Sequence, residues 1–332
     1  MEASGQNTKE MRLQEALRET LRYEMARDPR VFVMGEDVAL FGGAYGVTRG
    51  LLQEFGEGRV RDTPISEAAI VGLAAGAAIN GLRPVVEIQF CDLLPLCMDQ
   101  LVTHAARYHY MTGGRISVPL VVRNKYGTRP GGGPSHSSCN HGAFIPFPGL
   151  KIIAPTTPAD AKGLLLSAIR DPNPVLCFEG HLLYGVKGPV PEGDYTVPIG
   201  KAAIRRPGKD LTIVTCGGMV LTVDQVAQKL GEKGVAVEIV DLRSLAPLDT
   251  ETILASVAKT KRAMIVDEGP VIGGLVAELV AVIQEHLFSD LKGPVARVGA
   301  APIPPPHSGP LVDAMIPSVE RIEAEALRII GA

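Results

Sequence analysis

The residue best placed to do chemistry is a glutamate at the start of an apolar segment. Glu67 follows Thr63-Pro64, a pair that favours the start of a helix because Thr can cap it and Pro fits its first turn. An acid there also stabilises the helix dipole, which is the simpler, purely structural interpretation. However, residues 68–79 are apolar on every face, which predicts a buried helix and directs Glu67 towards the interior or a cleft. A carboxyl in such a place needs a specific partner, so Glu67 is a candidate catalytic residue.

A second candidate lies in a glycine-rich loop. His136 stands in the run Gly131-Gly-Gly-Pro-Ser-His136-Ser-Ser138, where glycines allow a ligand to approach the backbone closely. Histidine exchanges protons near neutral pH, so the loop could carry an acid–base residue. A mobile surface loop with an incidental histidine is the competing interpretation. His136 and His141 are five residues apart, a spacing that does not favour a metal site.

Sequence motifs for phosphate binding are absent from the chain. No G-x-G-x-x-G follows a predicted strand, and G-x-x-x-x-G-K-[ST] does not occur. The G-x-S-x-G elbow that carries a nucleophilic serine is also absent. Gly217-Gly218 and Gly273-Gly274 could each stand at a helix N-terminus, where phosphate binds, but ordinary strand-to-helix turns explain them equally well. The sequence therefore offers a candidate acid and a candidate base without a recognisable phosphate site.

Short apolar strands alternate with helical segments along both halves of the chain. Several strands are apolar on both faces, which predicts a parallel sheet covered by helices on two sides. Helices in the first half are predicted over 13–27, 94–111 and 158–170. A Gly- and Pro-rich stretch separates the halves. We therefore predict an α/β protein with two domains, residues 1–190 and 205–332, joined by a linker at 191–204.

Composition and charge exclude several classes of protein. With 33 Lys+Arg against 36 Asp+Glu, the formal net charge is −3, and no basic stripe suits nucleic acid or an anionic membrane. The longest apolar run, residues 68–79, is too short to span a bilayer. Five scattered cysteines without a C-x-x-C pair exclude a disulfide framework and any standard zinc spacing. With an N-terminus that lacks signal or transit character, these features predict a cytoplasmic protein.

Short motifs spread over nearly the whole chain resemble one family. Each is weak alone, but they occur in order: Gly35-Glu-Asp37, Asp62-Thr-Pro-Ile-Ser-Glu67, Gly81-Leu-Arg-Pro84, Asp99-Gln100, Tyr110-Met-Thr-Gly-Gly114, His136-Ser, Pro148-Gly-Leu150, Asp160-Ala-Lys162, Ala168-Ile-Arg-Asp171 and Asp241-Leu-Arg243. The set resembles the beta subunits of the thiamine-diphosphate-dependent decarboxylating component of 2-oxo acid dehydrogenase complexes, which include pyruvate, branched-chain 2-oxo acid and acetoin enzymes. The resemblance implies a pyrimidine-binding, transketolase-like parallel-sheet domain followed by a transketolase C-terminal-like α/β domain.

The resemblance also implies an oxidoreductase whose active site is shared with an alpha subunit in an α2β2 heterotetramer. In the family, the alpha subunit holds magnesium and the diphosphate through a G-D-G…N signature, which this chain lacks. Glu67 matches the glutamate that hydrogen-bonds the aminopyrimidine ring and so activates the cofactor. His136 matches the histidine that handles protons while an acyl group passes to the lipoyl group of an acyltransferase component. Phe90 and Leu93 match positions near the cofactor pyrimidine.

Five further positions match the potassium site of the family, mostly through backbone carbonyls: Leu120, Ala168, Ile169, Asp171 and Asn173. Without the resemblance, Asp171-Pro-Asn173 would be interpreted as a turn that ends a helix. The sequence departs from the family pattern at Leu93, where an aromatic residue is frequent, at Ser138, where Gln is usual, and around residues 139–141. Because the altered loop is expected near the substrate entrance, the substrate stays open.

Alternative functions also stay open. Phe41-Gly-Gly-Ala-Tyr-Gly-Val-Thr48 and Leu182-Leu-Tyr-Gly-Val-Lys187 slightly favour the acetoin branch over the 2-oxo acid branch. The C-terminal half of a split transketolase shares the fold and the glutamate, but it would need basic residues directed at a sugar phosphate, and no convincing cluster is found. A non-catalytic docking scaffold is the third possibility, and it would not need both Glu67 and His136.

Overall fold

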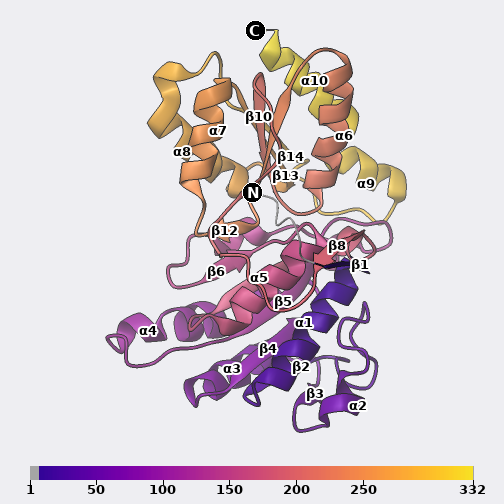
Figure 1. Cartoon of the computed structure of the whole chain (residues 1–332), viewed down its shortest axis with the longest axis vertical. Helices are drawn as coiled ribbons and strands as arrows, with labels where there is room; N and C mark the ends of the chain where they lie inside the picture. The colour runs from indigo at the N-terminus through magenta and orange to yellow at the C-terminus, as the bar shows by residue number, and fades with distance from the viewer. Residues whose placement is uncertain (1–6, 332) are drawn as a thin grey trace. The chain divides into compact units, whose positions relative to one another are not determined.

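The computed structural model describes residues 7–331 and contains two compact units (Figure 1). Unit 1 comprises the described residues up to Lys125 together with Pro146–Ile199. Unit 2 comprises Tyr126–Ile145 together with the described residues from Gly200 onward. Each unit has its own sheet and its own cluster of buried apolar residues.

The loop 126–145 groups with unit 2 by its contacts, whereas the sequence-based division placed it in the domain 1–190. The backbone N–H of Thr128 donates to Oε1 of Glu268 at 2.5 Å, which ties the start of the loop to unit 2. The other boundary follows residue 199, inside the predicted linker. The loop that carries His136 is therefore positioned by unit 2.

Unit 1 is built on a largely parallel sheet. Its strands follow the spatial order β6-β7-β5-β4-β2-β3, and β2 pairs in parallel with β3 and β4, β4 with β5, and β6 with β7. Every residue of β5 and of β7 is buried, as expected for strands that helices cover on both faces. The strand bounds are Val31–Gly35 (β2), Val60–Asp62 (β3), Arg83–Ile88 (β4), Val121–Tyr126 (β5), Lys151–Ile153 (β6) and Val175–Gly180 (β7).

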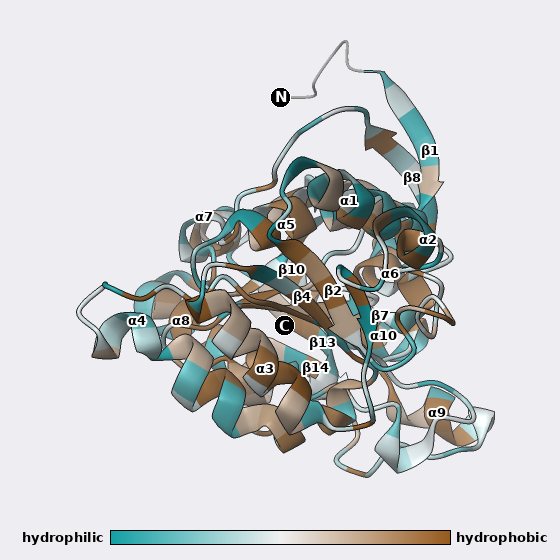
Figure 2. Cartoon of the chain, turned by 90° about the horizontal axis from the view of Figure 1, so that it is seen from below, coloured by the Kyte–Doolittle hydropathy of each residue, from teal (hydrophilic) through white to brown (hydrophobic). Residues whose placement is uncertain are grey.

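Helices cover both faces of this sheet. Helices α1 (Leu13–Arg27) and α5 (Pro158–Arg170) pack against each other on one face, and α3 (Glu67–Ile79) lies on the other (Figure 2). Leu17 of α1 and Leu164 of α5 are fully buried in the core between these helices and the strands. The shorter elements of unit 1 are α2 (Leu51–Phe55), η5 (His181–Leu183) and an antiparallel pair formed by β1 (Thr8–Arg12) and β8 (Lys187–Pro191).

The single amphipathic helix predicted over 94–111 is wrong in form. The chain there is divided into a 3-10 helix, η1 (Cys91–Cys97), a π-helix, η2 (Asp99–Ala106), and one α-helical turn, α4 (Tyr108–Met111). Pro95 lies inside η1 and lacks the N–H that a regular α-helix would use. Because Pro95 falls in the first turn of the predicted helix, where proline is tolerated, neither it nor the apolar periodicity indicates the breaks at residues 98 and 107.

Helix α3 is not buried on every face, contrary to the prediction for residues 68–79. Ile70 and Ala74 are buried against unit 1, whereas Leu73 is 65% exposed. The sequence pattern of residues 68–79 correctly indicates that the surface of α3 is apolar. However, the described residues of the chain cover only part of that surface. An exposed apolar helix face is typical of a contact with another molecule.

Unit 2 is a second α/β layer structure. Its sheet has the order β14-β13-β10-β11-β9 and is parallel except for β9, which runs antiparallel to β11. Helices α6 and α10 pack together on one face, and α7 and α8 on the other (Figure 1). The bounds are Gly133–Ser135 (η3), His141–Phe144 (η4), Ala203–Arg206 (β9), Leu211–Thr215 (β10), Met219–Glu232 (α6), Val237–Asp241 (β11), Ser244–Ala246 (β12), Thr250–Thr260 (α7), Ala263–Pro270 (β13), Leu275–Leu287 (α8), Phe288–Asp290 (η6), Ala296–Ala300 (β14), Gly309–Met315 (α9) and Val319–Ile330 (α10).

Two sequence-based exclusions can be compared with the described part of the chain. Within residues 7–331, no helix is both long enough and apolar enough to cross a lipid bilayer. The five cysteines are all buried, and none of them forms a disulfide. A disulfide framework is therefore absent from the fold of the described residues.

Candidate active site

Glu67 is the first residue of α3, and only 9% of its surface is exposed. Its carboxyl forms no hydrogen bond or ion pair with the described residues of the chain. Oγ1 of Thr63, four residues earlier, is also buried without a hydrogen-bond partner among those residues. Because buried polar groups are normally paired, this end of α3 is suited to a ligand that brings its own donors and acceptors.

Other titratable groups share the environment of Glu67. Burial raises the pKa of the Glu36 carboxyl, and the charges of Asp37 and Glu67 raise it further. Burial likewise raises the pKa of the Cys97 thiol to about 12, and the charge of Glu67 adds to this shift. The carboxyls of Glu36 and Glu67 and the thiol of Cys97 are therefore close enough for the charge on one to influence another.

The two positions expected near a pyrimidine lie at the start of η1. Phe90 precedes this helix, and the N–H of Leu93 donates to the Phe90 carbonyl at 3.0 Å. Both side chains are half-buried. The ammonium of Lys125 lies 5.4 Å from the centroid of the Phe90 ring and 4.6 Å from that of Tyr45. The charge of Lys125 partly offsets the rise in the pKa of Glu36. Lys125 therefore lies close both to these two aromatic rings and to the carboxyls near Glu67.

Lys125 is also part of a network of buried ion pairs. The guanidinium of Arg123 donates through Nε and Nη2 to the two carboxylate oxygens of Glu179, both at 2.7 Å, and through Nη1 to Oε2 of Glu87 at 3.0 Å. Nζ of Lys125 lies 3.3 Å from Oε1 of Glu87, and the Tyr184 hydroxyl donates to Glu179 at 2.6 Å. No local sequence pattern indicates this network, because its members lie on three different strands and on the C-terminal side of β7.

His136 is exposed and follows the short helix η3 in unit 2. Its Nδ1 lies 2.8 Å from Oγ of Ser135, a contact that orients the ring. Oγ of Ser137 donates to the Gly133 carbonyl at 2.7 Å and closes the turn. Glu67 belongs to unit 1 and His136 to unit 2.

Glycine is required where this loop meets the rest of unit 2. Gly133 has a φ of +65°, and a Cβ there would lie 2.2 Å from the ring of His307. The N–H of Gly131 donates to the His307 carbonyl at 3.0 Å. The loop is therefore packed against the body of unit 2, unlike the mobile loop considered as the competing interpretation.

The five positions that match a potassium site lie at the end of α5 and just before β5. The guanidinium of Arg83 donates to the carbonyls of Ile169 and Asp171, at 2.7 and 3.2 Å. The Asp171 carboxylate accepts the N–H of Asn173 at 2.9 Å and forms an ion pair with Lys151. Two cationic side chains thus lie among these oxygens, and the potassium site stays a prediction.

Two family models match the sequence. The model described as "Transketolase, pyrimidine binding domain" matches residues 9–187, and "Transketolase, C-terminal domain" matches residues 200–322. The pyruvate dehydrogenase E1 component subunit beta-1, mitochondrial, of Arabidopsis thaliana is 44% identical over 318 residues, which cover 95% of this chain and 88% of the relative. The 2-oxoisovalerate dehydrogenase subunit beta of Bacillus subtilis is 41% identical over 312 residues, 93% of this chain and 95% of the relative.

A third relative, the acetoin:2,6-dichlorophenolindophenol oxidoreductase subunit beta of Bacillus subtilis, is 40% identical over 331 residues and covers 96% of this chain and 97% of the relative. The chain belongs to the family of 2-oxo acid and acetoin dehydrogenase beta subunits. The resemblance inferred from the ordered motifs is therefore confirmed. Since this family depends on thiamine diphosphate, the pyrimidine-binding domain that carries Glu67 is the one expected to contact the cofactor ring.

The fold is also seen in a solved structure described as "Split gene transketolase, inactive beta4 tetramer". It superposes with a TM-score of 0.77 and covers 98% of this chain and 99% of that chain, at 22% sequence identity. At this identity the likeness supports the fold alone. The predicted order of a pyrimidine-binding α/β domain and a transketolase C-terminal-like α/β domain is thus confirmed.

Proposed function

We propose that this chain is the beta subunit of a thiamine-diphosphate-dependent dehydrogenase that cleaves a 2-oxo acid or acetoin and passes the acyl group to a lipoyl group. The observation that carries this proposal is the Glu67 carboxyl, which is buried at the start of α3 without a partner among the described residues. It occurs in a chain 40–44% identical to named dehydrogenase beta subunits. An unpaired buried carboxyl is the feature expected of a residue that meets its partner on a cofactor.

The residues around Glu67 fit a pyrimidine ring. When bound, thiamine diphosphate supplies a thiazolium that takes up the electrons released by carbon–carbon cleavage. A carboxylate oxygen of Glu67 would hydrogen-bond a ring nitrogen of the pyrimidine and hold the proton there. Phe90 and Leu93 would contact the ring, because both are half-buried at the start of η1. Because only 9% of the surface of Glu67 is exposed, little water would compete for this hydrogen bond once the ring is bound.

His136 would serve the second half of the reaction. It is exposed at the tip of a packed loop, where a long substrate arm can reach it. Its ring is oriented through Nδ1 by Ser135, so Nε2 would donate and accept the proton as the acyl group passes to the lipoyl sulfur. The altered residues Ser138 and 139–141 lie on the same loop and would affect which acyl group is accepted.

A partner subunit is part of the proposal. The sequence lacks a phosphate-binding motif, so an alpha subunit would hold the diphosphate and magnesium in an α2β2 heterotetramer. Large apolar side chains are exposed in unit 1 on α3 and on the segment that follows it, among them Leu73 (65%), Leu96 (59%) and Tyr110 (89%). Such surfaces are typical of obligate subunit contacts. A lipoyl acyltransferase component would be the second partner.

We also propose potassium as a structural ion and the cytoplasm as the compartment. The carbonyls of Leu120 and Ala168 each accept one backbone hydrogen bond and have a second lone pair for a cation. The absence of disulfides among the described residues suits a reducing compartment. Because some relatives are named as mitochondrial, fractionation of cells of the source organism is the test of the compartment.

Two alternatives from the sequence are less well supported. The structure described as a split-gene transketolase shares 22% identity, against 40–44% for the dehydrogenase subunits. A docking scaffold without catalysis does not explain why Glu67 is buried without a partner in the described chain. A substrate panel with 2-oxo acids, acetoin and sugar phosphates separates these functions.

The test begins with the native mass of the protein from its own source and the identity of every co-purifying chain. We expect a tetramer of two such chains and two larger partners that carry a G-D-G motif. The reassembled tetramer should turn over a 2-oxo acid or acetoin with an artificial electron acceptor, in potassium better than in sodium buffer, whereas this chain alone should be inactive. A stable homodimer that binds thiamine diphosphate unaided would contradict the shared active site.

His136→Gln is expected to slow acyl transfer to the lipoyl group by about 10²–10⁴-fold, because it removes the proton carrier. Cleavage measured with an artificial electron acceptor should fall much less, since the lipoyl group takes no part in it. His286→Gln, an exposed histidine on α8, is the matched control. Lipoyl transfer that stays within about twofold of wild type in His136→Gln would show that another group carries the proton.

A further inference from the structure

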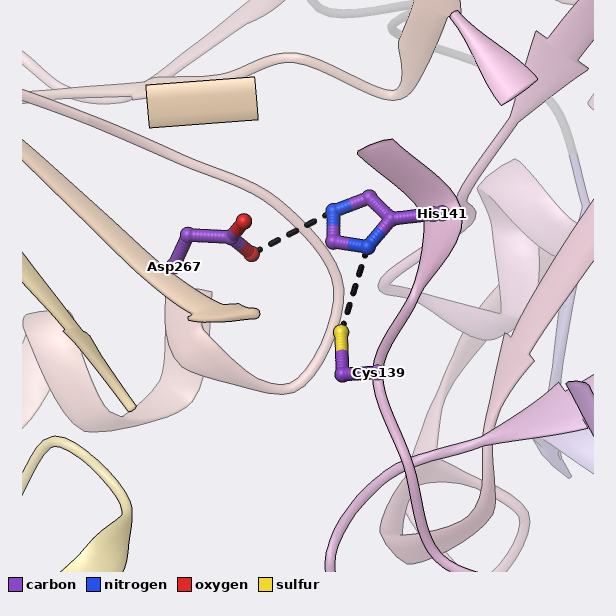
Figure 3. Close-up of side chains that lie close together, drawn as sticks. All are labelled: Cys139, His141 and Asp267. Atoms are coloured by element: carbon purple, nitrogen blue, oxygen red, sulfur yellow. Dashed lines mark hydrogen bonds and ion pairs between the residues drawn. The ribbon is translucent and has the colours of Figure 1, made fainter. Parts of the chain in front are cut away.

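A buried cluster in unit 2 joins a thiol, an imidazole and a carboxylate (Figure 3). Sγ of Cys139 lies 3.1 Å from Nδ1 of His141, and Nε2 of the same ring lies 3.3 Å from Oδ1 of Asp267. The thiol of Cys216 lies 4.0 Å from Nε2. All four residues are buried, with exposed fractions of 6%, 2%, 2% and 3% in this order. They come from the 126–145 loop, from the residue that follows β10 and from β13.

We infer that this cluster binds one transition-metal ion of the zinc type, with Cys139, His141 and Asp267 as ligands. Cys216 lies outside this closely spaced group and would become the fourth donor only if its thiol moved towards the ion. The ligand atoms of the first three all lie within 4.8 Å of one another. Bonds of roughly 2.0–2.3 Å in a tetrahedral site place ligand atoms about 3.3–3.8 Å apart. Binding would therefore draw the three side chains closer together than they are in the structure. Sulfur, nitrogen and oxygen together suit zinc or cobalt, whereas magnesium and calcium prefer oxygen alone.

A second observation points to a cation. Oδ2 of Asp267 is buried and makes no hydrogen bond of regular geometry with the described residues, although the backbone N–H groups of Glu268 and Gly269 lie near the carboxylate. A buried carboxylate oxygen without a partner is costly, and a bound cation would remove that cost. Space is also kept open beside it, because a Cβ at Gly269 would lie 2.9 Å from Oδ2 and 3.2 Å from the Cys139 carbonyl. A side chain at this position would therefore press against the carboxylate, and glycine avoids that clash.

Binding would change the hydrogen bonds of His141. In the structure its two ring nitrogens contact Cys139 and Asp267, so the imidazole bridges the two other ligands. A single ion binds only one of the two ring nitrogens of His141. If the ring rotated towards the ion, one of these two contacts would be replaced by a bond from nitrogen to metal. The thiol proton of each ligating cysteine would be released to solvent on binding.

The burial of the cluster assigns the ion a structural role. Catalytic zinc sites keep one position open to substrate, whereas these donors are all closed off from solvent. The ion would tie the 126–145 loop to β13, and the same loop carries His136. The ion would thus hold His136, the proposed proton carrier, in place. The inference that an ion binds here does not depend on the proposed function.

The test uses the full chain, with its partner subunit if one co-purifies, stripped of metal by a chelator and titrated with Co²⁺. We expect about one Co²⁺ per chain to produce the visible bands of tetrahedral cobalt and a near-ultraviolet thiolate charge-transfer band. A cofactor magnesium site supplies oxygen ligands and produces no thiolate band. Failure of wild type to develop that band would overturn the inference, and it would leave the dehydrogenase proposal untouched.

Variants assign the ligands. Cys139→Ser and Asp267→Asn should each weaken Co²⁺ binding by about 100-fold or more, and Cys139→Ser should also reduce the thiolate band. Cys97→Ser is the matched control: this buried thiol of unit 1 donates to the Leu94 carbonyl at 3.2 Å, a bond that serine retains. Far-ultraviolet circular dichroism checks that each variant is folded. In folded Cys139→Ser, an undiminished band would overturn the assignment, as would unchanged affinity in folded Asp267→Asn.

Discussion

Glu67→Gln is expected to lower turnover by about 10²–10⁴-fold while the chain stays folded. Glutamine has nearly the same shape as glutamate. However, its amide cannot give a proton to a ring nitrogen of the cofactor and take it back. The fold does not depend on the carboxylate, because this group forms no hydrogen bond or ion pair with the described residues. Only the helix dipole of α3 would be affected, at a cost of roughly 0.3–1 kcal/mol. Initial rates at saturating cofactor with an artificial electron acceptor measure the effect.

The control separates catalysis from stability. Glu57→Gln removes an exposed carboxylate from the same unit and should change neither the rate nor the melting temperature. The native mass of Glu67→Gln should equal that of wild type. If Glu67→Gln retains more than about a tenth of the wild-type rate, the carboxyl is not the proton-holding group, and the central step of the proposed function is wrong.

Elements whose signals are local could be predicted from the sequence. The helices predicted over 13–27 and 158–170 have these bounds in the structure. Each shows a regular apolar stripe and a definite start: the side chain of Thr157 accepts the N–H of Asp160 at 3.1 Å before α5. The position of Glu67 at the start of a helix could be predicted for the same reason, because a short run of residues marks where the apolar helix begins.

Features that depend on tertiary contacts could not be predicted. The open face of α3 and the divided helix at 94–111 differ from the prediction because they depend on tertiary packing, which the apolar periodicity does not contain. The cluster of Cys139, His141 and Asp267 joins residues far apart in sequence, so no standard zinc spacing appears. Its first two members lie in the part of the loop that departs from the family pattern. That departure was the one sequence signal that could have drawn attention to the cluster.

Arg123→Met is expected to destabilise the chain by about 3–5 kcal/mol, the largest stability effect that the structure predicts. Arg123 is 1% exposed, and its removal leaves the carboxylates of Glu87 and Glu179 without their main partner. Urea unfolding at a fixed protein concentration measures the loss. Arg328→Met is the matched control: Arg328 also forms a two-point contact with a carboxylate, Glu325, but on the surface, where water solvates the carboxylate left behind.

The loss in Arg123→Met should also depend on pH. In wild type, burial by itself raises the pKa of Glu87, but Arg123 and Lys125 together hold it below its ordinary value. Glu87 therefore stabilises wild type above the unfolded pKa, and this contribution is lost as the pH falls. Without Arg123, burial is opposed by Lys125 alone, so the pKa rises and the folded variant retains a proton that the unfolded chain has released. Stability of the variant should then fall as the pH rises, and its deficit should be larger at about pH 8 than at about pH 5. An equal deficit at both pH values would show that lost packing, and not the uncompensated charge, causes the destabilisation.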